Sequence, residues 1–140
     1  MERLFNGDCD PKQLSPLTLA FVGDGVYGLL VRERLVCQAN CPVQQLHNQS
    51  VAQVCCGAQA KAMEQLMDSL TEEEISVYKR GRNAKSTPPK NASVADYHAA
   101  TGLEALFGYL YLSGQRERME FLFQTAFGQA DQNSLKENNE

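Results

Sequence analysis

Apolar residues recur every three or four positions through most of the chain, and no segment shows the alternation typical of a strand. This spacing predicts helices over residues 17–38, 50–70 and 94–112, a short helical turn near 45–47, a helix after Thr71, and a last helix carrying Met119 to Phe127. Ser15 before Pro16, and Thr71 with Glu74, are typical helix starts. We therefore expect an all-α helical bundle.

Length and composition indicate how this bundle is bounded. The chain has 140 residues, which suits one domain. Residues 1–14 carry no clear helix signal, and the segment after residue 128 is polar. We therefore expect a lead-in over residues 1–14, one domain over 15–128, and a disordered tail over 129–140. Residues 81–93, which contain Pro88 and Pro89, predict a loop.

Two of the predicted helices each contain one acid in an otherwise apolar stretch. Asp24 is the only charged residue between Pro16 and Val31, and Glu104 is surrounded by leucine and aromatic residues in the helix over 94–112. A helix that is apolar on every face is expected to be buried. A lone carboxylate inside it costs several kcal/mol unless it is paired, protonated or bound to a metal.

Small residues flank both acids, at Gly23, Gly25, Gly102 and Gly108. Because glycine costs about 1 kcal/mol relative to alanine inside a helix, we expect the two helices to cross closely at these points. Two interpretations follow. The acids face each other and share a hard cation, or each lies at a helix edge or meets a basic residue such as Lys61.

The formal net charge of −4 argues weakly against a nucleic-acid partner, but the charges are unevenly distributed. Residues 79–90 contain no acid and hold Lys79, Arg80, Arg82, Lys85 and Lys90. Such a segment can bind phosphates or can be a solvated surface. No apolar run is long enough for a membrane span and no signal peptide is visible, so a cytoplasmic protein is expected. The five cysteines are expected to be reduced and buried.

Three runs of sequence resemble a known family. Residues 19–27, LAFVGDGVY, resemble the signature helix of the ribonuclease III superfamily, and residues 101–112, TGLEALFGYLYL, resemble its second acidic helix. Between them, KRGRNAKS at 79–86 followed by PKN at 89–91 is typical of the Mini-ribonuclease III branch. The resemblance extends from about residue 17 to residue 127.

This resemblance implies a helical endonuclease domain that acts as a homodimer on double-stranded RNA, with one active centre per subunit. It implies Mg²⁺ as cofactor, with Mn²⁺ as a substitute, and the precursor of large-subunit (23S) ribosomal RNA as substrate. A ribosomal protein is a further candidate partner. Asp24 and Glu104 match the catalytic and metal-binding acids. The RNA-binding residues would be Lys79, Arg80, Arg82, Asn83, Lys85 and Lys90.

The chain departs from the superfamily pattern at three positions. Ala20 and Thr101 stand where full-length ribonuclease III proteins carry further acids, and Gly28 stands where many relatives have glutamate. Fewer carboxylates per centre argue against tight binding of two metals. The alternative function is a non-catalytic RNA-binding protein with the same fold. A purely structural interaction domain would leave the basic segment unexplained.

Overall fold

The computed structural model describes residues 3–138, and it describes side chains as far as Phe127. In this part of the chain all regular structure is helical, which confirms the predicted all-α class. The elements are η1 (Pro11–Gln13), α1 (Pro16–Gln38), α2 (Val43–Val54), α3 (Cys56–Leu66), η2 (Met67–Ser69), α4 (Glu72–Arg82), α5 (Val94–Leu112) and α6 (Arg116–Asn138). Within the described residues, none of these helices is long and apolar enough to cross a membrane.

The predicted helix starts are confirmed. The Ser15 hydroxyl accepts a hydrogen bond from the backbone N–H of Thr18 at 3.2 Å, and Pro16 occupies the first turn of α1. The Thr71 hydroxyl accepts from the Glu74 N–H, and the Glu74 carboxylate accepts in return from the Thr71 N–H. These bonds satisfy N–H groups that have no partner within the helix.

The helix expected over residues 50–70 is two helices. α2 begins earlier, at Val43, and ends at Val54, while α3 starts after Cys55, whose backbone is extended. The Cys55 N–H donates to Val51 and its carbonyl accepts from Gln59, so this residue belongs to both helix ends. The Gln59 side chain donates to the Val54 carbonyl at 3.0 Å. The backbone groups at the end of α2 are therefore hydrogen-bonded, although the break itself contains neither glycine nor proline.

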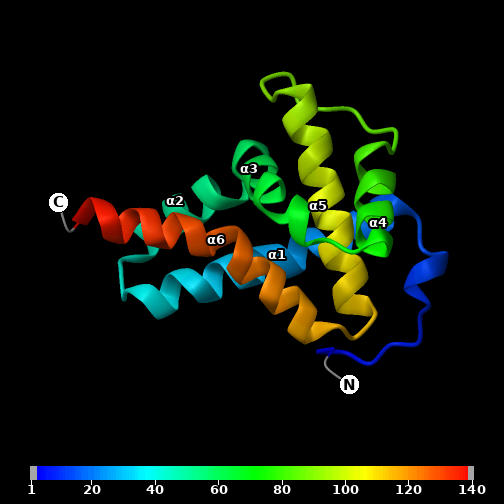
Figure 1. Ribbon diagram of the computed structural model, residues 1–140, viewed down its shortest axis with the longest axis horizontal. Helices are drawn as coiled ribbons and strands as arrows, with labels where there is room; N and C mark the ends of the chain where they lie inside the picture. Colours follow the sequence, from blue (N-terminus) through cyan, green and yellow to red (C-terminus); the bar gives the residue numbers. More distant parts are fainter. Residues whose placement is uncertain (1–2, 139–140) are drawn as a thin grey trace.

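The central element is α5, which contacts α1, α3, α4 and α6 (Figure 1). Most of its residues are buried, including Leu103, Leu106 and Phe107, which are all 0% exposed. Tyr27 of α1 packs edge-on against Phe107, with ring centroids 5.3 Å apart. Each acid predicted to form the site therefore lies on a helix that the core holds in place.

One face of α1 is exposed, although its composition predicts burial on every side. Leu19, Tyr27 and Val31 are buried, but Phe21 is 82% exposed and Leu29 is 53% exposed. The prediction was wrong because a bundle of this size cannot cover an apolar helix completely. The cysteines also differ from expectation. They are free, but none of the five is buried.

Helix α6 continues to Asn138, so its backbone includes most of the segment for which the sequence predicts a disordered tail. The side chains beyond Phe127 lie outside those that the structure describes. The division into a lead-in over 1–14, a domain over 15–128 and a tail over 129–140 stays a prediction.

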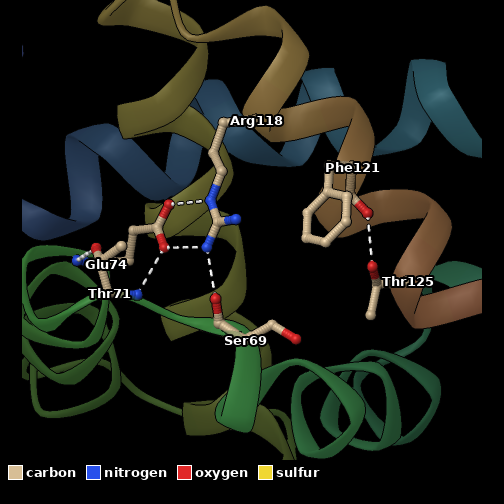
Figure 2. Close-up of polar contacts among 6 residues, drawn as sticks. All are labelled: Ser69, Thr71, Glu74, Arg118, Phe121 and Thr125. Carbon is tan, nitrogen blue, oxygen red and sulfur yellow. Dashed lines mark hydrogen bonds and ion pairs between the residues drawn. The ribbon is translucent and has the colours of Figure 1, made fainter.

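A partly buried ion pair connects α6 to the start of α4 (Figure 2). The Arg118 guanidinium donates to both oxygens of Glu74, at 2.9 and 2.8 Å, and also to the Ser69 carbonyl. The hydrogen bond from Arg118 lowers the pKa of Glu74 below its usual value of 4.5, and the Thr71 N–H acts in the same direction. This network holds α6 against the first turn of α4.

We predict that Arg118→Ala lowers the free energy of unfolding by about 2–3 kcal/mol, because it leaves the Glu74 carboxylate buried without its cation. The pKa of Glu74 is lowered by folding, so its contribution is present above pH 4.5 and is lost as the pH falls below that value. Glu120→Ala, which breaks an exposed pair with Arg116, is the control, with an expected loss of about 0.5 kcal/mol or less. Urea titrations at pH 7 and pH 3.5 measure the free energy of unfolding of both variants. Equal losses for the two variants would contradict the assigned role.

Candidate active site at the crossing of α1 and α5

The two predicted acids come from helices that touch backbone to backbone. A Cβ atom built on Gly23 would lie 1.6 Å from the Glu104 carbonyl oxygen, and one built on Gly108 would lie 2.0 Å from the Leu19 carbonyl oxygen. No side chain fits at either position. The close crossing predicted from the glycines is therefore confirmed for Gly23 and Gly108.

The other two glycines have different neighbours from those expected. A Cβ on Gly25 would meet nothing within 4 Å, so Gly25 plays no part in the crossing within this subunit. Gly102 instead packs against Tyr78 of α4, whose ring would lie 2.6 Å from an added Cβ. The crossing with α1 is thus set by one glycine from each helix, and Gly102 sets the distance between α5 and α4.

At this crossing the side chains of Asp24 and Glu104 lie within hydrogen-bonding reach of each other. Asp24 is exposed, and Glu104 is half-buried. Burial, with the neighbouring Asp24 carboxylate acting in the same direction, raises the pKa of Glu104 to about 8. The structure therefore brings the two acids together, as the first interpretation of the sequence expected, and Lys61 is exposed and pairs with neither.

The positions where the superfamily carries further acids do not add polar groups to this site. Ala20 is buried, and the hydroxyl of the buried Thr101 donates to the Tyr97 carbonyl one turn earlier, at 3.0 Å. Among the described side chains, no cluster of three or more His, Cys, Asp or Glu residues could hold a metal ion. What this chain offers a cation is a pair of carboxylates, the oxygen ligands that Mg²⁺ prefers.

The basic segment begins on α4 beside the same turn of α5. A Cβ on Gly81 would lie 3.0 Å from the Gly102 Cα and 3.2 Å from the Thr101 carbonyl oxygen, so the backbone of the segment packs closely two residues from Glu104. Arg82 lies over the Tyr78 ring, 5.5 Å from its centroid, and its Nε donates to Asn83 at 3.4 Å. The side chains of Lys79, Arg80, Lys85 and Lys90 are exposed. The structure thus packs the backbone of the basic segment against the helix that carries Glu104 and leaves these four cations exposed.

One cation on the same helix as Asp24 was not singled out from the sequence. The guanidinium of Arg32 folds back along α1, and its Nη1 atom lies 2.9 Å from the place where a Gly28 Cβ would be. Gly28 is one turn from Asp24 on the same helix. The spacing of Asp24, Gly28 and Arg32, four residues apart each time, is the signal in the sequence that could have suggested this arrangement.

The acid pair leads to a prediction about the stability of the metal-free protein. Folding raises the pKa of Glu104 from 4.5 to about 8, so the folded state holds a proton that the unfolded state releases, and stability falls as the pH rises from 4.5 to 8. Asp24→Asn removes one of the two charges and should make this fall smaller, with melting at pH 8 unchanged or later. If Asp24 were instead a structural acid that accepts a hydrogen bond from a donor, the same substitution should lower the free energy of unfolding by roughly 1–3 kcal/mol.

Thermal melts in EDTA between pH 4.5 and 8.5 distinguish the two roles. Asp68→Asn, at an exposed acid in η2, is the matched control and should follow the wild-type curve. An Asp24→Asn protein that melts earlier than this control at pH 8 would show that Asp24 is paired with a donor and not repelled by Glu104.

Comparison with known proteins places this chain in a family. Residues 17–115 match the ribonuclease III domain. The chain is 51% identical over 108 residues to Mini-ribonuclease 3 of Thermoanaerobacter sp. (strain X514), covering 76% of both proteins. It is 48% identical over 118 residues to Mini-ribonuclease 3 of Symbiobacterium thermophilum, covering 84% of this chain and 91% of the relative.

The fold has a solved relative as well. A crystal structure of a Fusobacterium nucleatum protein superposes with a TM-score of 0.77 at 29% identity, and covers 84% of this chain and 96% of that one. The domain match includes α1 and α5 with both acids, as well as the basic segment between them. The chain therefore belongs to the ribonuclease III family, in the branch of the Mini-ribonuclease III enzymes, and is an endoribonuclease.

Proposed function

We propose that this protein is a Mg²⁺-dependent endonuclease of double-stranded RNA whose metal is held by Asp24 and Glu104. The observation that carries the proposal is the acid pair itself. Two carboxylates face each other at the α1–α5 crossing, and the pKa of one is raised to about 8. Such a pair is unfavourable for folding unless it binds a cation or a proton. A catalytic need for a hard cation at this point would explain why the two carboxylates lie together.

The two carboxylates would have different tasks in phosphodiester hydrolysis. Asp24, which is exposed, is the principal metal ligand and orients the attacking water. Glu104, which is half-buried, would be the second ligand, directly or through a water. Bound Mg²⁺ would lower the pKa of a water and polarise a phosphate oxygen. Mn²⁺, which also prefers oxygen ligands, would substitute for it.

The basic segment would hold the RNA. The positive charges of Lys79, Arg80, Arg82, Lys85 and Lys90 lie on α4, which packs against α5, and on the loop that follows it, and Asn83 can bond to a phosphate or a 2′-hydroxyl. Such contacts recognise the shape and backbone of an RNA duplex more than its sequence. They also explain how a protein with a net charge of −4 can bind a polyanion.

The exposed face of α1 would form a homodimer interface. Leu17, Phe21 and Leu29 lie on it, and a groove of about 370 Å³ beside them is lined by α1, α6 and Tyr111. An apolar patch of this kind on a soluble enzyme is typical of an interface. Because a twofold axis pairs a surface with itself, α1 of one subunit would pack on α1 of the other.

The natural substrate would be the precursor of large-subunit (23S) ribosomal RNA, which also implies action in the cytoplasm. Support for this comes from the similarity to the Mini-ribonuclease 3 proteins. A ribosomal protein that shapes the precursor is a candidate accessory partner. Comparison of RNA 5′ ends in cells with and without the gene tests the substrate.

We predict that Asp24→Asn abolishes cleavage of long duplex RNA in Mg²⁺ and leaves RNA binding within about twofold of the wild type. The substitution keeps the shape of the side chain and removes the charge that holds the cation. Asp68→Asn is again the control and should cleave normally. Cleavage by wild-type protein in EDTA, or by Asp24→Asn in Mg²⁺, would refute the assignment. A wild type that binds duplex RNA but never cuts it would support the non-catalytic alternative.

We predict that replacing Arg80, Arg82 and Lys85 together with alanine weakens duplex binding and reduces the salt dependence of affinity. Each lost phosphate contact should lower the slope of log affinity against log salt by about 0.9. Fluorescence anisotropy across a salt series measures it. An unchanged slope would show that the basic segment is only a solvated surface.

We predict that Phe21→Asp converts a dimer into monomers, because it puts a charge into the apolar contact. Val43→Asp, at an equally exposed apolar position on α2, is the control and should stay dimeric. Sedimentation equilibrium measures both, and a wild type that sediments only at 15.5 kDa would contradict the dimer.

A further inference from the structure

The first described residues form an N-terminal arm, residues 3–8, that is bonded to the end of α5 (Figure 1). The backbone N–H of Leu4 donates to the hydroxyl of Tyr111, in the last turn of α5, at 2.7 Å. The ring of Phe5 folds back over Gly7, where an added Cβ atom would lie 2.8 Å from it. The arm therefore has a defined position, although residues 3–8 contain no helix.

The arm holds two large apolar side chains in water. Leu4 is 84% exposed and Phe5 is 82% exposed, so packing within the subunit accounts for neither. A single exposed leucine needs no explanation. Two adjacent large apolar side chains on a segment that is held in place instead indicate a contact surface.

This apolar surface continues the exposed face of α1. Leu4 lines the groove of about 370 Å³ beside α1 together with four residues of that helix: Val22, Gly25, Val26 and Leu29. A Cβ added at Gly25 would meet nothing within 4 Å, so the groove is open at this point. The arm therefore stands at the edge of the surface proposed for the contact between subunits.

The area that a dimer needs favours a second copy of the chain as the partner of the arm. A stable interface buries about 800 Å² per partner, and one phenylalanine can bury roughly 150–250 Å². The exposed face of α1 presents Phe21 and two partly covered leucines, Leu17 and Leu29, which together fall short of that area. The arm adds a second phenylalanine and a third leucine to the same surface.

The chemistry of the arm also favours protein over RNA as its partner. The side chains of Leu4 and Phe5 carry neither charge nor hydrogen-bonding groups, so they gain little from a polyanionic duplex, where phosphate contacts dominate binding. The exposed face of α1 in a second copy is apolar and complements them.

We propose that the arm of each subunit packs against the second copy of the chain, where Leu4 and Phe5 extend the α1–α1 contact. This inference rests on the homodimer of the proposed function. The twofold axis that pairs α1 with α1 brings both arms into the interface, one from each subunit. Because the bond to Tyr111 anchors the arm, it stays on its own subunit and is covered by the partner.

A charge-matched pair of variants tests the contribution of the arm. Leu4→Asp combined with Phe5→Asp should raise the dissociation constant of the dimer about tenfold or more, because two charges enter an apolar contact. The control is Val43→Asp combined with Val94→Asp, which adds the same charge at positions 81% and 60% exposed on α2 and α5. Sedimentation equilibrium over a dilution series measures both dissociation constants.

Photocrosslinking tests the same contact without added charge. With p-benzoylphenylalanine in place of Phe5, irradiation should join two subunits covalently, whereas the same group in place of Val43 should not. A dissociation constant equal to that of the charge-matched control would overturn the proposal, as would crosslinks from position 5 that stay within one subunit or reach only added duplex RNA. Failure of the homodimer itself is seen separately, as wild-type protein that sediments at 15.5 kDa at every concentration.

Discussion

The site depends on how closely α1 and α5 approach each other. The contact at Gly23 is made by the carbonyl of Glu104 itself, so the distance between the helices and the position of the second acid are one constraint. Gly108 makes the reciprocal contact with the Leu19 carbonyl, one turn before Gly23 on α1. A methyl group at either glycine would push apart the backbones that carry the carboxylates. The two glycines therefore lower the helix propensity of both segments, and in return they place the two acids side by side.

The sequence predicts this crossing because both signals lie within single helices. An isolated acid in an apolar stretch and a nearby glycine are visible without knowledge of the fold, so Asp24, Glu104, Gly23 and Gly108 could be identified in advance. Which helix packs against a glycine depends on the arrangement of the whole bundle. Gly102 was therefore expected to contact α1, whereas it contacts α4. The break at Cys55 was missed for a similar reason. The hydrogen bond that completes this break comes from the Gln59 side chain, and no glycine or proline marks the position in the sequence.

Exposure was harder to predict than secondary structure. Composition shows that α1 is apolar, but only the arrangement of the other helices decides which of its faces stays uncovered, and Phe21 lies on that face. The direction of a long side chain is likewise set by local space. Arg32 lies over Gly28 because nothing else occupies that volume. Helices and acids could therefore be predicted from the chain, whereas the surfaces available to a partner could not.

The arrangement of charges also explains how few acids the site contains. Ala20 and Thr101 supply no carboxylate, and Thr101 uses its hydroxyl within α5. Adding a third acid beside a pair in which the pKa of Glu104 is already raised to about 8 would increase the repulsion that folding must overcome. A centre with two acids avoids this, but it offers a cation fewer ligands and holds it less firmly. Under the proposed function the RNA would then be positioned largely by contacts outside the centre, which is the role proposed for the exposed cations of the basic segment on α4.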